Sequence, residues 1–541
     1  MGRETNIDSI RVLEKQIEEG KGDTIKLKRD RNSLLSISTR VPPEILGYIF
    51  ACGLVREAGH VYSWFFEGLQ KGSYNFILVC HHWFEVASRT PELWSFWGNT
   101  LQDWKKRHSH WAGAFPLDLV LDEHQCEPDT FDQSLEDAVR SRVTQDTIRR
   151  VHLTSGSGGA LPSIISSLTP DDKGGQNENI ESVVWHKEGS IVWRKEESPP
   201  VDISNFFARS CLSKLRSLEL YGDLRISSWD YLAPRTTLLT ALSLNIDTFP
   251  PSPTLTTAQL FSILVSNPNL QELLLSSAAL PNDADRSSFK VQLRHLKLLS
   301  LEGEPCHLLG LLHRLVLPEM LDHMELIVSD STDDVLQTLA PYIQDHFQRD
   351  ARFQDRLGVC SSSRLGSISI SVGVIRAQAT PQVLEPPQVS LDIYHDIPSR
   401  NVLKQWSTSL IALVPLERVV FFNDGSSMKL PGEAFLMMPN VETLYFSDPE
   451  SYERFLQPNP DGPHVNENIL PSLRLLRLED IPPLDDDSWG RLTTFLAHRA
   501  SKSQTISLEV IRRFSHTCPK VPDRIKDLVK EFTYTETGED D

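Results

Sequence analysis

The chain has 541 residues, of which 73 are acidic and 54 are lysine or arginine, giving a formal net charge of −19. This length suits several domains or one elongated repeat array, and the acidic balance, with no long basic stretch, argues against a nucleic-acid partner. The 7 cysteines are scattered and form no Cys-x-x-Cys pair, so we expect a reducing compartment and no zinc site. No apolar run approaches the length of a membrane span, so we expect a cytoplasmic or nuclear protein with no membrane partner.

Residues 7–36 carry apolar side chains on a heptad pattern that glycines interrupt. Gly20 and Gly22 weaken a helix, so this pattern predicts two short helices rather than one coiled coil. Two roles stay open for this N-terminal helical segment, residues 1–37: packing against the module that follows it, and dimerisation.

The stretch from Val41 to Phe50 predicts the start of an amphipathic helix. Proline suits the first helical positions, and an acidic residue in the first turn, Glu44, complements the helix dipole. Its apolar residues lie on one stripe that must be covered: Ile45, Leu46, Ile49 and Phe50. A second apolar segment, Phe76–Ala87, has a large aromatic residue at its centre and is the expected cover.

Three words in this region resemble the F-box: Val-Pro-Pro-Glu-Ile-Leu at 41–46, Ile-Phe at 49–50 and Val-Cys-His-x-Trp at 79–83. F-box modules dock substrate receptors on the Skp-type adaptor of cullin-RING ubiquitin ligases, and the flanking words resemble a large group of fungal F-box proteins. The resemblance implies that the matching residues form the adaptor-binding face together with the core of the module: Pro42, Glu44, Ile45, Leu46, Ile49, Val79, Cys80 and Trp83. We assign the F-box and its linker helices to residues 38–112.

Four tryptophans follow at spacings that place them on one face of a predicted helix: Trp94, Trp97, Trp104 and Trp111. An aromatic stripe of this kind is typical of a core between a helical module and its neighbour, rather than of a ligand site.

From about residue 148 the chain repeats the word Leu-x-x-Leu-x-Leu, whose last three positions alternate with the period of a strand. Its copies begin at Leu215, Leu239, Leu270, Leu296, Leu416, Val441 and Leu473. A helical stretch, Thr257–Ser266, precedes the third copy, and Pro-Asn or Pro-Ser turns lead into several copies. We therefore predict repeated units of helix, turn and strand. The array resembles the irregular leucine-rich repeats that are common behind F-boxes.

The resemblance implies that these units stack with parallel strands along one wall. The predicted fold class is α/β: a helical F-box module followed by an irregular leucine-rich-repeat-like solenoid of parallel strands and helices at residues 113–532, with an acidic disordered tail at 533–541. Weaker candidate strands lie at 149–153, 182–185, 368–370 and 506–508. Between residues 302 and 416 the word is lost, and Phe347–Ser363 and Ala377–Gln388 are predicted to be long loops that interrupt the array.

The repeat word also predicts a binding surface. Because strand side chains alternate between two faces, the residues between and after the leucines face away from the core. In the last third of the chain these positions form an apolar and aromatic patch beside an arginine: Val420, Phe422, Tyr445 and Arg477. We expect this patch to bind a protein substrate, or to be covered by the chain's own C-terminal segment or a neighbouring loop. The acidic balance favours a basic or apolar target segment over a phosphorylated one.

Motifs for other chemistry are incomplete. The loop Gly156–Gly159 follows a predicted strand but lacks the spacing of a phosphate-binding loop. His81 and His82 are consecutive on a helix and point about 100° apart, so they do not readily share a metal. The acidic run Asp485–Asp487 lacks further oxygen ligands in register for calcium. We therefore predict a protein that is not an enzyme, with no catalytic residue, no cofactor and no metal.

The functional expectation is a substrate-recognition subunit of a cullin-RING ubiquitin ligase of the SCF type. Its F-box docks on the Skp-type adaptor of the cullin complex, and its repeats hold an unidentified protein target. The alternative is a protein-binding scaffold with a degenerate F-box and no ubiquitin chemistry. Val41 and His81, which replace the usual leucine and basic residue, and the long connection over residues 51–78 favour that alternative.

Overall fold

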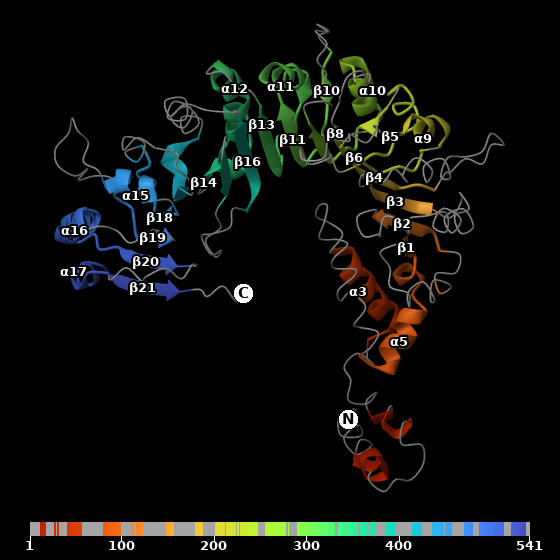
Figure 1. Ribbon diagram of the computed structural model, residues 1–541, viewed down its shortest axis with the longest axis horizontal. Coiled ribbons are helices and arrows are strands. Elements are labelled where there is room, and N and C mark those ends of the chain that lie inside the picture. The colour runs from red at the N-terminus through yellow and green to blue at the C-terminus, as the bar shows by residue number, and fades with distance from the viewer. Residues whose placement is uncertain are drawn as a thin grey trace, which may run out of the picture. The chain divides into compact units, whose positions relative to one another are not determined.

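The computed structural model describes residues 11–17, 26–28, 30–31, 41–56, 79–98, 111, 115–122, 148–155, 179–187, 201–210, 212–222, 224–226, 228–246, 255–276, 280, 289–329, 334–354, 357–364, 367–374, 385–394, 414–424, 435, 437–447, 449–456, 470–479, 486–512 and 521–536. The protein is mixed α/β, and its strands are mostly parallel (Figure 1). It divides into two compact units, residues 1–237 with 247–252 (unit 1) and residues 238–246 with 253–541 (unit 2). In these ranges no helix combines the length and the apolar character needed to cross a membrane.

Unit 1 contains a helical module built from α3 (Pro43–Arg56), α5 (His81–Ser88) and the 3-10 turn η3 (Pro91–Leu93). The Leu46 amide donates to the Pro42 carbonyl at 3.0 Å, so the first helix begins where its prolines predict. Cys80 is the extended N-cap residue of α5. The indole Nε1 of Trp94 donates to the Ala87 carbonyl at 2.6 Å, which ties the end of α5 to the chain that leaves the module. In the N-terminal segment, residues 11–17, 26–28 and 30–31 are helical.

The strands of unit 1 run parallel in chain order: β1 (Phe96–Gly98), β2 (Leu117–Asp122), β3 (Ile148–Ser155), β4 (Ser182–Lys187) and β6 (Ser217–Gly222). Beside them lie α9 (Ser204–Arg209) and the short pair β5 (Val201–Asp202) and β7 (Leu224–Arg225). The weaker candidate strands at 149–153 and 182–185 are therefore confirmed. The predicted tryptophan helix is wrong, because Trp97 lies in β1. Trp94 and Trp111 do share a core, with ring centroids 4.6 Å apart, and Trp104 lies outside the described residues.

Unit 2 begins with four parallel strands in chain order: β8 (Ala241–Ile246), β9 (Glu272–Leu275), β11 (Leu298–Gly303) and β13 (His323–Val328). The helices α10 (Thr257–Ser266), α11 (Pro305–Leu312) and α12 (Asp334–Arg349) lie along one side of them (Figure 1), with the short pair β10 (Val291–Gln292) and β12 (Leu315–Val316). α10 has the predicted bounds, and Thr256 and Gln259 form a capping box at its start. Asn267 precedes the Pro268-Asn269 turn, and its buried side chain accepts from the Leu239 amide and donates to the Ile263 carbonyl.

The expected interruption of the chain-order array is present in unit 2, but the long loops predicted there are wrong for the described residues. Phe347–Ser363 is the end of α12, the turn η7 (Ala351–Gln354) and most of β14 (Leu357–Arg364), and residues 385–388 start β16 (Glu385–Tyr394). Residues 377–384 lie outside the described residues. β16 pairs in parallel with β13, and β14 pairs in parallel with β17 (Val419–Asp424). Between them, β15 (Ser367–Val374) pairs antiparallel with both β14 and β16, so the sheet continues through one reversed strand.

The last strands of unit 2 again run parallel in chain order: β17, β18 (Thr443–Phe446), β19 (Leu475–Glu479), β20 (Ser507–Arg512) and β21 (Glu531–Glu536). The turn η8 (Leu416–Arg418) leads into β17, and the helices that follow are α15 (Pro449–Leu456), α16 (Asp486–Ser501) and α17 (Asp523–Lys526). The predicted disordered tail begins too early, because residues 531–536 form β21. Asp487 belongs to the first turn of α16 and pairs with Arg491 at 3.2 Å, so the acidic run opens a helix.

Candidate docking surfaces

Helix α3 divides its apolar residues between a buried and an exposed face. Leu46 and Phe50 are buried in a small core. Its other members are Val86 and Ala87 of α5 and, further along the chain, Leu93 and Trp94. The ring of Phe50 lies 5.0 Å from that of Trp83. This core fixes the orientation of the helix, and Trp83 acts as the predicted cover for Phe50.

Among the described residues, the other face of α3 is exposed to solvent. Ile45 is 52% exposed, Ile49 is 52% exposed and Tyr48 is 69% exposed. Val79, before α5, is 60% exposed, and Pro42 and Glu44 are also exposed. The prediction that one covered stripe holds Ile45 and Ile49 together with Leu46 and Phe50 is therefore wrong. We call the exposed set the docking face: Pro42, Glu44, Ile45, Tyr48, Ile49 and Val79.

The eight residues predicted to bind the adaptor thus fall into two groups. Five of them lie on the docking face: Pro42, Glu44, Ile45, Ile49 and Val79. Leu46 belongs to the core, while Cys80 and Trp83 are partly buried. The resemblance did not include Tyr48, although its place three residues after Ile45 on a helix puts it on the same face.

Gly47 sets how closely α3 approaches the end of α5. A Cβ atom built on Gly47 would lie 2.6 Å from Thr90 Oγ1. That hydroxyl donates to the Val86 carbonyl at 2.8 Å, so its position is fixed by the C-terminal turn of α5. Glycine is needed here because the backbone of one element meets the side chain of another.

The second candidate surface lies on the last strands of unit 2. Tyr445 and Arg477 are aligned on β18 and β19, and the Arg477 guanidinium lies 5.6 Å from the centre of the Tyr445 ring. Arg477 Nε is 3.6 Å from Glu509 Oε2, and Glu509 is the aligned residue of β20. These three side chains are partly buried and form one row across three strands. Sequence reasoning missed Glu509, because β20 carries only part of the repeat word.

Two predicted members do not belong to this row. Phe422 is 1% exposed, with its ring 6.1 Å from that of Phe435, and Val420 is 8% exposed. The pairing of β14 with β17 shifts register at Leu357 and Gly358, so that Phe422 aligns with Val359 and Leu444, which are buried. Asn423 takes the place beside Tyr445. The shift changes which residues of β17 face the core, so Phe422 and Val420 are not available to a substrate.

His81 Nε2 lies 3.9 Å from Glu85 Oε1 across one turn of α5, with both side chains exposed, as in an ordinary helical pair. The loop Gly156–Gly159 lies outside the described residues.

A comparison with protein-family models finds no match, and a comparison with curated proteins finds none either.

Proposed function

We propose that this protein is the substrate-recognition subunit of a cullin-RING ubiquitin ligase of the SCF type, with its helical module docking on a Skp-type adaptor. The observation that carries this proposal is the docking face: an exposed apolar surface on a helix whose opposite side is held by a buried core. Exposed apolar patches of this kind mark protein interaction sites. Five of its six residues match the F-box motif, and the sixth, Tyr48, adds an aromatic side chain of the type that interfaces favour.

The proposal assigns no catalysis to this chain. A substrate receptor raises the local concentration of its target near the transferring enzyme, so it needs two binding surfaces and no reacting group. The strands of unit 2, which we infer to be an irregular leucine-rich-repeat-like array, supply the second surface. The row of Tyr445, Arg477 and Glu509 offers an aromatic ring, a cation and an anion for contacts with a protein target.

Adaptor capture tests the proposal. Ile45→Asp combined with Ile49→Asp places two charges on the docking face and leaves Leu46 and Phe50 in the core. The variant should no longer capture a purified Skp-type adaptor, while its circular dichroism and melting temperature stay those of the wild type. Val265→Asp is the matched control, because Val265 is an equally exposed apolar residue on α10 in unit 2. Undiminished capture by the double variant would contradict the proposal.

A further inference from the structure

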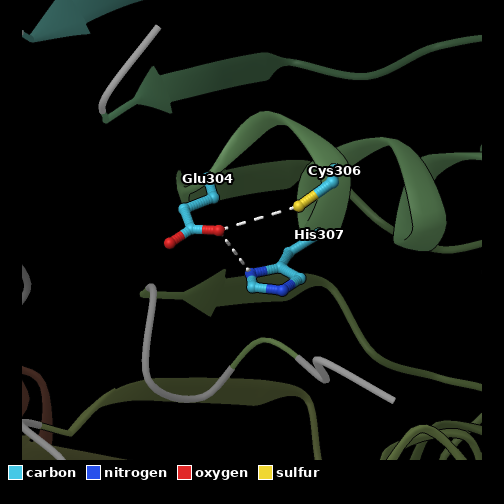
Figure 2. Close-up of side chains that lie close together, drawn as sticks. All are labelled: Glu304, Cys306 and His307. Carbon is cyan, nitrogen blue, oxygen red and sulfur yellow. Dashed lines mark hydrogen bonds and ion pairs between the residues drawn. The ribbon is translucent and has the colours of Figure 1, made fainter. Parts of the chain in front are cut away.

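Three metal-binding side chains converge at the start of α11, a place where the sequence predicted no metal. Figure 2 shows Glu304, Cys306 and His307 directed toward one another. Glu304 Oε2 lies 3.7 Å from Cys306 Sγ and 3.9 Å from His307 Nδ1, and all three donor atoms lie within 4.8 Å of one another. The group does not match a Cys-x-x-Cys pattern, because one donor is a carboxylate and another an imidazole.

The backbone holds these residues in place. Glu304 is the extended N-cap residue between β11 and α11, and Pro305 occupies the first helical position, where its fixed φ suits the helix. The Glu304 carbonyl accepts from the amides of His307 and Leu308. Leu308, Leu311 and Leu312 are buried and anchor the opposite side of α11, which leaves Cys306 exposed and His307 partly exposed.

The donor set selects the kind of metal. Thiolate sulfur, imidazole nitrogen and carboxylate oxygen are the ligands of Zn²⁺, whereas Ca²⁺ and Mg²⁺ prefer oxygen alone. Bond lengths of about 2.0–2.3 Å imply that donors around tetrahedral Zn²⁺ lie roughly 3.3–3.8 Å apart. Both distances from Glu304 are near that range, and the Cys306 and His307 donors lie within 4.8 Å of each other, so side-chain rotations are needed to close the site.

We propose that Glu304, Cys306 and His307 bind one Zn²⁺ ion, with water at the fourth position. On binding, the Cys306 thiol releases its proton to solvent and its sulfur forms the bond to zinc, and His307 binds as a neutral imidazole through Nδ1. The thiolate and the carboxylate balance the two charges of the ion. The helix N-terminus disfavours a cation but favours the thiolate that holds it. Cys306 and His307 are consecutive helical residues, as His81 and His82 are, but Glu304 lies near both of them, so the three donor atoms come within 4.8 Å of one another.

Titration of the full chain, reduced and stripped with a chelator, tests this inference with Co²⁺ as a spectroscopic substitute for Zn²⁺. We expect one strongly bound ion that gives a sulfur-to-cobalt charge-transfer band and is displaced by Zn²⁺. Cys306→Ser should abolish the band, whereas Cys80→Ser, which removes the other described free thiol, should retain it. Glu304→Gln and His307→Asn should each weaken binding at least about tenfold. These residues lie outside the core, so their substitution leaves the fold intact.

Three results would overturn the inference: a band that survives in Cys306→Ser, a band that is lost equally in Cys80→Ser, or binding with no sulfur-to-cobalt band. Lower pH should weaken binding by the wild type, because protons compete for the thiolate and the imidazole. None of these measurements involves the adaptor, so their outcome is independent of the proposed function.

Discussion

At the scale of single residues, the close contact between Gly47 and Thr90 makes the helical module sensitive to one methyl group. In Gly47→Ala the new Cβ would press on Thr90 Oγ1, which is fixed by its bond to Val86. We expect the free energy of unfolding of the module to fall by about 1–3 kcal/mol. Gly310→Ala is the control, because this glycine of α11 has open space where the Cβ would be, so helix propensity alone should stabilise it by about 0.5–1 kcal/mol.

Chemical denaturation of both variants measures the difference. Equal effects at Gly47 and Gly310 would show that α3 and the Thr90 turn are not in contact.

His152 on β3 predicts a pH dependence for unit 1. Burial, followed by the nearby His186, lowers the pKa of His152 from 6.5 to about 4. The folded state therefore excludes a proton that the unfolded chain binds below pH 6.5. Stability from this residue is fully present above pH 6.5 and is lost as the pH falls toward 4, by at most about 3 kcal/mol. Denaturant melts of wild type and His152→Gln between pH 7 and pH 4 check this, and parallel curves for the two proteins would contradict it.

At the scale of elements, each copy of the repeat word correctly predicts a strand. All seven copies contain a strand, because leucines at alternating positions are buried between the sheet and the helices, as Leu273 and Leu299 are. Strands that bury other residues were missed or predicted only in part. β13 has Met324 where the word requires leucine, and the predicted candidate strand at 368–370 covers only part of β15, which alternates serine with isoleucine and valine. Pairing with neighbouring strands makes these segments strands, and a single sequence does not display that pairing.

The candidate sites were predicted only in part, because which residues the core covers also depends on contacts that a single sequence does not display. The F-box words give the start of α3 and most of the docking face, but they do not say which apolar residues the core covers. Ile45 and Leu46 are adjacent in the sequence and lie on opposite sides of that boundary. The place of Phe422 in the core depends on the shifted pairing of β14 with β17, a contact between distant segments.

Arg499 of helix α16 makes hydrogen bonds to the segment that precedes β19. The Arg499 guanidinium donates to the carbonyls of Leu470 and Leu473, both at 2.9 Å, and burial lowers its pKa. Arg499→Met would leave these buried carbonyls without their donor, at a cost of about 2–4 kcal/mol. Arg474 is exposed, and its Nη1 lies 4.0 Å from Glu442 Oε2. Arg474→Met should therefore lower the free energy of unfolding by less than about 1 kcal/mol. Equal destabilisation in urea melts would contradict this account of α16.

At the scale of the whole molecule, β15 links the two parallel parts of the sheet in unit 2. Among the described strands, β16 and β14 meet through β15 and not directly. Ile370→Pro would remove a ladder hydrogen bond and distort the strand, at a cost of about 3 kcal/mol or more. We expect calorimetry to show unit 2 unfolding in two transitions or losing its transition, whereas Ile370→Val should keep one. A single unchanged transition for the proline variant would contradict this role of β15.

The central claim is that the docking face binds a Skp-type adaptor, and hydrogen exchange of the full chain with and without purified adaptor tests it most directly. Binding should protect the amides of Glu44–Phe50 and of residues 79–83 and leave the strands of unit 2 unchanged. Ile45→Asp combined with Ile49→Asp should abolish that protection. Protection confined to unit 2, or no protection at adaptor concentrations that saturate known receptors, would contradict the claim.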